Sequence, residues 1–180
     1  ENKPESFYAI SKYVKSYFSD AYSKLYGFHI TALRYFNVYG PRQDYRRSIP
    51  PLMSSIILSL LTGERPKIFG DGSKRRDFIY VDDVNKFHEI LLNDKRSYGK
   101  VYNVGTGVNF SVNEIYNIIS SILKTNIKPV YKDDIPGEAF QNLADISNAK
   151  KLGWRPNVKI EQGLRYSIEH LKKLKERGFL

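Results

Sequence analysis

The feature that most constrains the fold of this chain is a regular alternation of short β-branched or aromatic runs with longer amphipathic segments. The short runs have the composition of strands, and the longer segments have the three- and four-residue periodicity of helices. Alternating strands and helices favour an α/β fold with parallel strand pairs. The expected strands are His29–Phe36, Lys67–Phe69, Phe78–Val81, Val101–Val104 and Ile127–Tyr131. The expected helices are Phe7–Leu25, Pro50–Leu61, Asp82 or Asp83 to Leu92, Ser111–Leu123, Ser147–Leu152 and Gln162–Arg177.

Local signals set several of the expected boundaries. Residues 37–43 are expected to be a loop because they contain a Gly-Pro pair, and Gly63 is expected to end the helix Pro50–Leu61. The expected caps are a capping box of Ser111 with Glu114, Asp82 or Asp83, and Ser147.

The segment Phe7–Leu25 is expected to form an unusually wide apolar helix. Ser6 is a suitable N-cap, and Gly27 is a suitable C-terminal stop. A second stripe, made of three tyrosines, widens the apolar surface beyond one face. Such a helix packs on two sides, either inside the core or against another subunit. The three tyrosines are Tyr13, Tyr17 and Tyr26.

The composition excludes several classes of protein. The chain has no cysteine, which excludes disulfides, thiolate catalysis and Cys-ligated zinc and favours a cytoplasmic location. The longest apolar run, around Ile56–Leu61, is too short to span a bilayer, so no membrane partner is expected. No basic-then-apolar leader opens the sequence.

The net charge of +10 and the pI near 9.6 point to an anionic partner. A nucleic acid, a membrane surface and a nucleotide diphosphate all fit this charge. No helix-turn-helix, zinc pattern or aromatic–basic interleaving is recognisable, so no nucleic-acid partner is expected. A basic nucleic-acid-binding module is the alternative function from another class of protein.

Tyr8 and Lys12 stand four residues apart, on one face of the expected first helix. An ammonium group beside a phenol favours the phenolate. It can lower the ordinary tyrosine pKa of about 10 by roughly 1–3 units. Tyr8 is therefore a candidate base, although the spacing alone is common in a chain rich in Tyr and Lys.

Three further local patterns contain candidate binding residues. Asn37 follows a strand, where its amide can bind a sugar hydroxyl or satisfy turn backbone. Arg76 follows the turn Gly70–Ser73. Its guanidinium can bind a phosphate through two N–H groups or form a surface ion pair with Asp77. Glu138 lies in a loop and can accept ribose hydroxyls.

Together these patterns resemble the extended short-chain dehydrogenase/reductase family of NAD-dependent nucleotide-sugar epimerases and dehydratases. Its 4-epimerases of UDP-glucose or UDP-N-acetylglucosamine are the most similar branch. The resemblance covers Tyr8 to about Trp154. The motifs, in order, are Tyr-x-x-x-Lys, Arg-Tyr-Phe-Asn-Val-Tyr-Gly-Pro-Arg-Gln, Phe-Gly-Asp-Gly-Ser…Arg-Asp-Phe-Ile-Tyr-Val-Asp-Asp-Val, Asn-Val-Gly-Thr-Gly and Leu-Gly-Trp-x-Pro.

The resemblance implies roles for individual residues. Tyr8 looks like the catalytic base, and Lys12 like the residue that lowers its pKa and binds the nicotinamide ribose. Both are expected to contact NAD, as are Tyr35 and Phe36. The implied substrate-binding residues are Asn37 for the sugar or diphosphate, Lys67, Ile68 and Phe69 around the base, Arg76 for the diphosphate and Glu138 for the ribose.

The resemblance also implies a fold, a reaction and an assembly. The fold would be α/β, combining the C-terminal part of a Rossmann-type parallel sheet (residues 1–45, with about 78–105 returning to it) with a smaller α/β substrate-binding domain (mainly 46–180). The reaction would be epimerisation at C4 of a UDP-sugar through a 4-keto intermediate. A 4,6-dehydratase and a UDP-glucuronate decarboxylase or epimerase are alternatives on the same scaffold. A homodimer through the Tyr8–Leu25 helix is expected.

The sequence departs from the family pattern at two places. The family's glycine-rich loop and the Ser or Thr that works with the Tyr have no counterpart here, so we expect a fragment that is inactive alone. Ile135 occupies a position where an arginine for the diphosphate is common, and Lys132 is a possible substitute. No metal site is expected, because His29, His88 and His170 lack ligand spacing.

Overall fold

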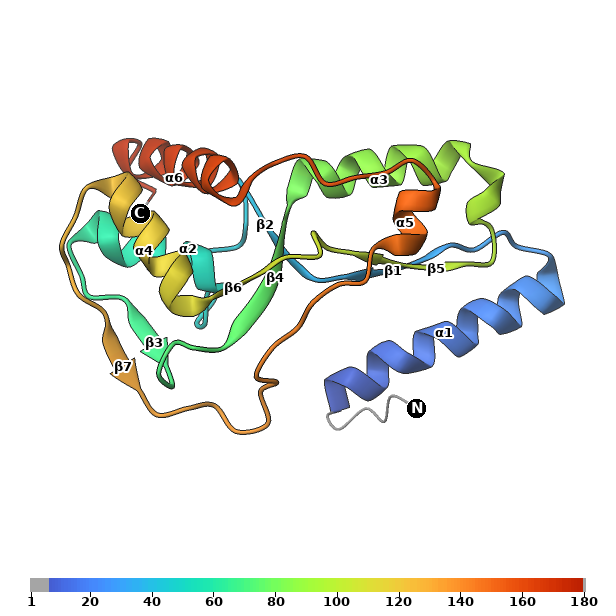
Figure 1. Ribbon diagram of the computed structural model, residues 1–180, viewed down its shortest axis with the longest axis horizontal. Helices are drawn as coiled ribbons and strands as arrows, with labels where there is room; N and C mark the ends of the chain where they lie inside the picture. The colour runs from blue at the N-terminus through green and yellow to red at the C-terminus, as the bar shows by residue number, and fades with distance from the viewer. Residues whose placement is uncertain (1–6, 180) are drawn as a thin grey trace.

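The computed structural model describes residues 7–179, apart from the side chain of Tyr8. Two groups of elements lie at opposite ends of an elongated molecule, and central strands join them (Figure 1). Strand pairs β1–β5, β2–β4 and β3–β7 are parallel, and helices lie against them. This architecture confirms the predicted α/β class.

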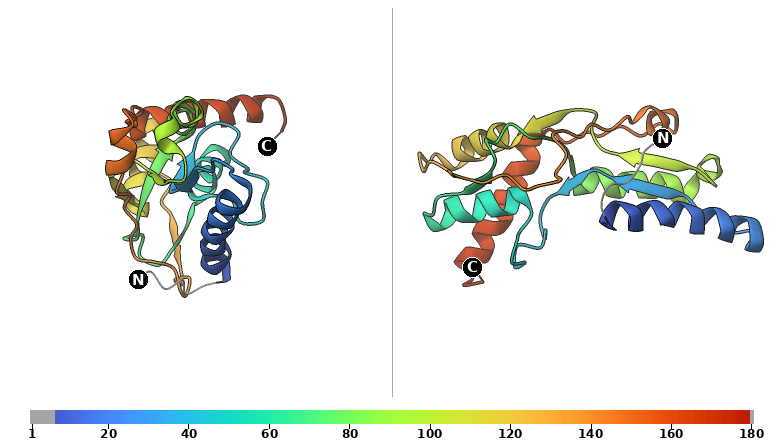
Figure 2. Two further views of the ribbon diagram at one scale, coloured as in Figure 1. Left: turned by 90° about the vertical axis from the view of Figure 1, so that its right-hand side faces the viewer. Right: turned by 90° about the horizontal axis from the view of Figure 1, so that it is seen from below.

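The first group is built on the parallel pair β1 (Ala32–Tyr35) and β5 (Val101–Val104). The helix α3 (Val81–Asn93) runs along one side of this pair, and α1 (Phe7–Tyr26) lies on the other (Figures 1 and 2). The short helix α5 (Ser147–Lys151) packs at β5, and a 3₁₀ turn, η1 (Lys95–Ser97), follows α3. The core of this group contains Ile79, Val84, Phe87, Tyr102, Val104 and Trp154.

The second group packs three helices over a second core. These are α2 (Leu52–Thr62), α4 (Val112–Leu123) and α6 (Ile160–Glu176). The parallel pair β3 (Lys67–Phe69) and β7 (Val130–Lys132) forms its outer edge. The fully buried side chains at its centre are Ile56, Ile57, Ile68, Ile115, Ile119 and Leu164.

The strand β4 (Arg75–Tyr80) connects the two groups. It pairs in parallel with β2 (Asn37–Tyr39) and antiparallel with β6 (Asn109–Ser111). The prediction of a loop from residue 37 to 43 is wrong for its first three residues, because they find hydrogen-bonding partners in a strand some forty residues away. The sequence analysis also missed β6 and placed the start of β4 too late.

Helix boundaries follow local chemistry where capping side chains are present. The predicted capping box of α4 is confirmed: Glu114 N–H donates to Ser111 Oγ (3.1 Å), and Ser111 N–H donates to Glu114 Oε2 (2.6 Å). Gly63 ends α2 in the left-handed conformation (φ 80°), as predicted.

Two predicted caps are wrong and one cannot be compared. Tyr80, rather than Asp82 or Asp83, occupies the N-cap of α3, and both aspartates lie in the first helical turn. Ile146 rather than Ser147 precedes α5. The predicted cap at Ser6 lies outside the described residues.

Apolar side chains along α1 are exposed, whereas the other long helices bury a face. Phe7 (94%), Tyr17 (61%), Phe18 (60%) and Leu25 (74%) all retain large accessible fractions. No helix within residues 7–179 is long and apolar enough to cross a membrane.

Candidate functional site

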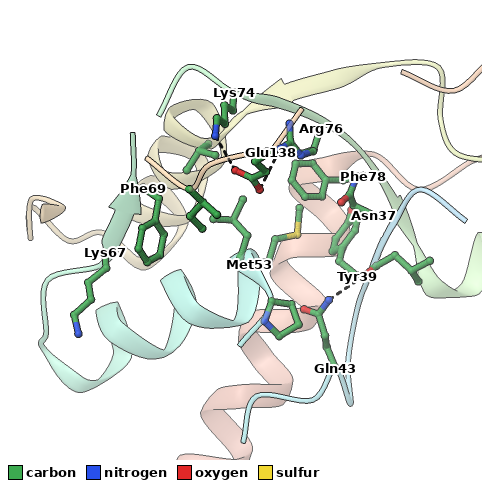
Figure 3. Close-up of a pocket in the computed structure, with 15 residues that line it drawn as sticks. Asn37, Tyr39, Gln43, Met53, Lys67, Phe69, Lys74, Arg76, Phe78 and Glu138 are labelled. Atoms are coloured by element: carbon green, nitrogen blue, oxygen red, sulfur yellow. Dashed lines mark hydrogen bonds and ion pairs between the residues drawn. The ribbon is translucent and has the colours of Figure 1, made fainter. Parts of the chain in front are cut away.

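A cavity of about 410 Å³ lies where the central strands meet the second group of elements. The starts of α2 and α4 line it, together with β2, β3, β4 and the loop 133–138. Figure 3 shows its side chains. Five of the six predicted substrate-binding residues line this one cavity, and Ile68 does not: the five are Asn37, Lys67, Phe69, Arg76 and Glu138.

The charge of the cavity suits an anionic ligand. Three basic residues, Lys67, Lys74 and Arg76, line it with one acidic residue, Glu138. The first turns of α2 and α4 add partial positive charge from backbone N–H groups. Anions are favoured at such helix N-termini.

Arg76 and Lys74 both bind the carboxylate of Glu138. Arg76 Nη2 is 3.2 Å from Glu138 Oε1, and Lys74 Nζ is 2.9 Å from Glu138 Oε2. Lys74 also pairs with Asp134. The hydrogen bonds to Asp134 and Glu138 raise the pKa of Lys74, and the bond from Lys74 lowers the pKa of Asp134.

The alternative prediction for Arg76, a surface pair with Asp77, is wrong. Asp77 is fully buried, and its carboxylate accepts hydrogen bonds from backbone and hydroxyl groups. Oδ1 accepts from Thr106 N (2.8 Å) and Thr106 Oγ1 (2.8 Å), and Oδ2 accepts from Gly107 N (2.9 Å) and Ala144 N (3.1 Å). Side chains alternate along β4, so Asp77 turns into the protein while Arg76 faces the cavity.

Asn37 is held in place by the backbone of β4. Its Nδ2 donates to the carbonyl of Asp77 (2.9 Å) and lies 3.4 Å from Asn142 Oδ1. Asn142 Oδ1 also accepts from the backbone N–H of Asp77 (2.8 Å). The amide therefore has a fixed orientation at the edge of the cavity. It satisfies the backbone of β4 rather than that of its own turn, and its contact with a sugar hydroxyl stays a prediction.

The strand β3 separates its three predicted base-binding residues. Lys67 and Phe69 are among the residues that line the cavity, whereas Ile68 is fully buried in the second core. This follows from the two-residue period of a strand. The exposed ring of Phe69 offers an apolar face of the kind that a planar base can cover.

The sequence analysis missed Lys74 and several neutral lining residues. Lys74 precedes Arg76 by two residues, a spacing that puts both side chains on one side of an extended segment, and that signal was available. Gln43 was missed because its position depends on tertiary contacts: its Nε2 donates to the Val38 carbonyl (3.0 Å) and its Oε1 accepts from Ser54 (2.8 Å).

Tyr39 also lines the cavity, but its environment does not suit a base. It is buried, and burial raises its pKa. The phenol therefore stays protonated at neutral pH. Among the described residues that line the cavity, no tyrosine is therefore an alternative to Tyr8 as the predicted base.

The predicted catalytic and cofactor residues lie with the first group of elements. Lys12 is exposed on α1, and the side chain of Tyr8 lies outside the described structure. Phe36 follows β1 and packs partly against the first core. Tyr35 turns towards α3, where its hydroxyl lies 2.8 Å from His88 Nε2. Lys12, Tyr35 and Phe36 are not part of the cavity lining.

The fit of these residues to a dinucleotide is partial. The carboxyl end of the parallel pair β1–β5, next to Phe36, is the kind of edge where α/β folds bind nucleotides. Lys12 is accessible on the helix alongside. Tyr35 does not fit this arrangement, because its hydroxyl is hydrogen-bonded to His88.

No cluster of three His, Asp or Glu side chains suited to a metal ion occurs among residues 7–179. His88 Nδ1 contacts the Val84 carbonyl (2.9 Å), and His29 stacks on Tyr98. Both rings thus have local partners.

Comparison with known proteins decides the family. Residues 1–105, more than half of the chain, match the NAD dependent epimerase/dehydratase family. The chain belongs to this family. This result confirms the resemblance drawn from the ordered motifs.

Relatives in the family resemble nearly the whole chain. A putative UDP-glucose 4-epimerase of Methanocaldococcus jannaschii is 37% identical over 94% of the chain and 54% of its own length. The chain therefore spans about half the length of such a relative.

Two solved structures of family members share the fold. The UDP-glucose 4-epimerase of Thermotoga maritima, with UDP-glucose, superposes with a TM-score of 0.89 at 35% identity, over 93% of this chain and 54% of that one. The UDP-glucuronic acid 4-epimerase of Bacillus cereus, with UDP-glucuronic acid and NAD, gives 0.89 at 31% identity, over 97% and 55%. These likenesses confirm the Rossmann-type α/β fold class.

Proposed function

We propose that the protein containing this chain epimerises a UDP-sugar at C4 with NAD as cofactor. The observation that carries the proposal is the gathering of Asn37, Lys67, Phe69, Arg76 and Glu138 around one positively charged cavity. UDP-sugars bound to the two similar solved structures support the same class of ligand.

The cavity residues anchor the nucleotide in this proposal. Arg76 binds the diphosphate, Glu138 accepts hydrogen bonds from the ribose, and Phe69 covers the base with Lys67 beside it. Asn37, fixed by the backbone of β4, contacts the diphosphate or the sugar. Firm anchoring of the nucleotide leaves the sugar free to turn, which epimerisation requires.

Two residues of α1 carry out the proton transfer in this proposal. Tyr8 takes the proton of the sugar 4-hydroxyl as a phenolate and returns it after the sugar has turned. Lys12, one helical turn away, favours the phenolate by its charge. NAD, when bound, accepts a hydride and gives it back. The residues proposed to hold NAD are Tyr8, Lys12, Tyr35 and Phe36.

The reaction is tested by incubating the complete protein and NAD separately with UDP-glucose, UDP-galactose, UDP-N-acetylglucosamine and UDP-glucuronate. We expect at least one of the four to be converted into its C4 epimer, up to a constant ratio of the two sugars, without accumulation of NADH. If none of the four is converted by protein that binds NAD, the proposal is wrong.

Dehydration is the second candidate, because the family to which the chain belongs includes dehydratases. The same incubation separates the two reactions. A 4,6-dehydratase releases water and forms a 4-keto-6-deoxy sugar, whereas an epimerase leaves the mass of the UDP-sugar unchanged. Mass spectrometry of the product therefore decides between them.

We further propose a homodimer through α1 and a division into two domains. The exposed apolar side chains of α1 support the first, since a contiguous apolar surface of this kind marks an interface. The two separate cores support the second, with residues 1–45 and about 78–105 in the cofactor domain and the chain from 46 onward otherwise mainly in the substrate domain. The segment 144–154 departs from the predicted division, because Ala149 and Trp154 pack in the first core. The cytoplasmic location stays a prediction.

A further inference from the structure

The carboxylate of Glu138 lies between the two most enclosed cations of the cavity (Figure 3). The side chains of Lys74 and Arg76 are only 11% and 13% exposed, whereas that of Glu138 is 42% exposed. One oxygen faces each cation, at 2.9 Å from Lys74 Nζ and 3.2 Å from Arg76 Nη2. This is the geometry in which two cations bind adjacent oxygens of one anionic group.

The segment that carries Glu138 is held mainly by polar contacts. Residues 131–140 are all exposed, and 133–140 contain no helix or strand. Lys74 binds Asp134 and Glu138, and Arg76 binds Glu138 and the Phe140 carbonyl (3.2 Å). The acidic side chains of Asp134 and Glu138 are 55% and 42% exposed, so water competes with the cations for both, and such ion pairs contribute little stability. A ligand that takes over the two cations can therefore release Glu138 at small cost.

We propose that Glu138 occupies the anion position of the cavity, that a diphosphate displaces it, and that Lys74 then binds the diphosphate together with Arg76. The identity of the ligand as a nucleoside diphosphate rests on the proposed function, whereas the exchange concerns any diphosphate. Lys74 thereby becomes a second binding cation, and Glu138 becomes free to turn to the ribose.

Inorganic pyrophosphate is the probe that isolates this exchange, because it has no ribose for Glu138 to bind. Its affinity for the complete protein is measured by calorimetry at low salt, where the electrostatic contribution is largest. Because Glu138→Gln removes the competing carboxylate, we expect pyrophosphate to bind about three- to tenfold more tightly. We expect Lys74→Gln to bind it about three- to tenfold more weakly.

Matched controls separate the local effect from net charge. Lys172→Gln and Glu176→Gln make the same charge changes at exposed positions of α6, and we expect less than about twofold change for either. Lys74→Arg keeps the charge and is expected to restore binding, which excludes loss of folding as the cause.

The proposal is overturned if Glu138→Gln binds pyrophosphate no more tightly than the unaltered protein, or if Lys74→Gln behaves like Lys172→Gln. Either result can occur in a protein that still epimerises UDP-sugars. Conversely, the exchange can be seen in a protein that converts none of them, so the two proposals fail separately.

Discussion

The buried carboxylate of Asp77 is the point at which a single substitution should affect the fold and the site together. Its four accepted hydrogen bonds join β4 to Thr106, Gly107 and Ala144, and the backbone of the same residue holds Asn37 and Asn142. In Asp77→Asn, one of the two oxygens becomes an NH₂ group that faces two donors whichever way the amide is turned.

The cost follows from the donors that lose their acceptor. With the NH₂ group at the Oδ2 position, Gly107 N and Ala144 N are both left unpaired. At the Oδ1 position the Thr106 hydroxyl can rotate to accept, but Thr106 N is still unpaired. An unpaired buried donor costs about 1–3 kcal/mol, and the amide takes the orientation that leaves one donor unpaired, so we expect a loss of about 1–3 kcal/mol in the free energy of unfolding.

Asp83 provides a matched control, because it is equally buried but uses only one oxygen. Oδ2 accepts from both Asn157 N (3.0 Å) and Val158 N (2.9 Å), and Oδ1 has no hydrogen-bond partner within the described structure. An asparagine can place its NH₂ group at Oδ1 and keep both bonds. We expect Asp83→Asn to change the free energy of unfolding by less than about 1 kcal/mol.

Urea denaturation followed by the fluorescence of Trp154, the single tryptophan of the chain, measures both values. Trp154 is buried and donates to the Asp83 carbonyl, so its emission reports on this region. If Asp77→Asn unfolds at the same urea concentration as the unaltered protein, or Asp83→Asn is the more destabilised variant, the reasoning is refuted.

Three further predictions concern α4 and α1. Ser111→Ala removes the N-cap of α4 and should lower the free energy of unfolding by about 1 kcal/mol, measured in the same urea experiment. The hydrogen bond from the Ser111 backbone N–H lowers the pKa of Glu114 below its ordinary 4.5. The stability that Glu114 contributes is therefore present above pH 4.5 and is lost as the pH falls through the lowered pKa. Urea midpoints measured at several acidic pH values follow this loss. Phe18→Glu places a charge on the exposed apolar face of α1 and should shift a dimer to monomer in sedimentation velocity, while Asp20→Asn, on the opposite side of the same helix, should leave it dimeric; a dimer that survives Phe18→Glu contradicts the proposed interface.

Local chemistry explains why some elements could be predicted from the sequence. The helix α1 has a long periodic pattern, and α4 carries both partners of its capping box within four residues. The strand β2 has neither advantage: its three residues become a strand only by pairing with β4. The cap of α3 was misplaced because Asp83 instead binds the backbone of residues 157 and 158.

The identity of many site residues could be predicted from the sequence, but their contacts could not. The family resemblance named five residues that line one cavity, although they are spread from position 37 to 138. The sequence does not show which of these residues contact one another. That Glu138 bridges Lys74 and Arg76, and that Asp77 is buried rather than paired with Arg76, depends on how the loop 133–142 returns to β4.

The most direct test of the account is the epimerase activity of Tyr8→Phe, compared with Tyr26→Phe on the same helix. Both variants lose one hydroxyl and keep the ring. With NAD and the UDP-sugar that the unaltered protein converts, we expect Tyr8→Phe to lose a factor of about 100 or more in kcat and Tyr26→Phe to retain full activity. A Tyr8→Phe variant as active as the unaltered protein would contradict the proposed role of α1 in catalysis.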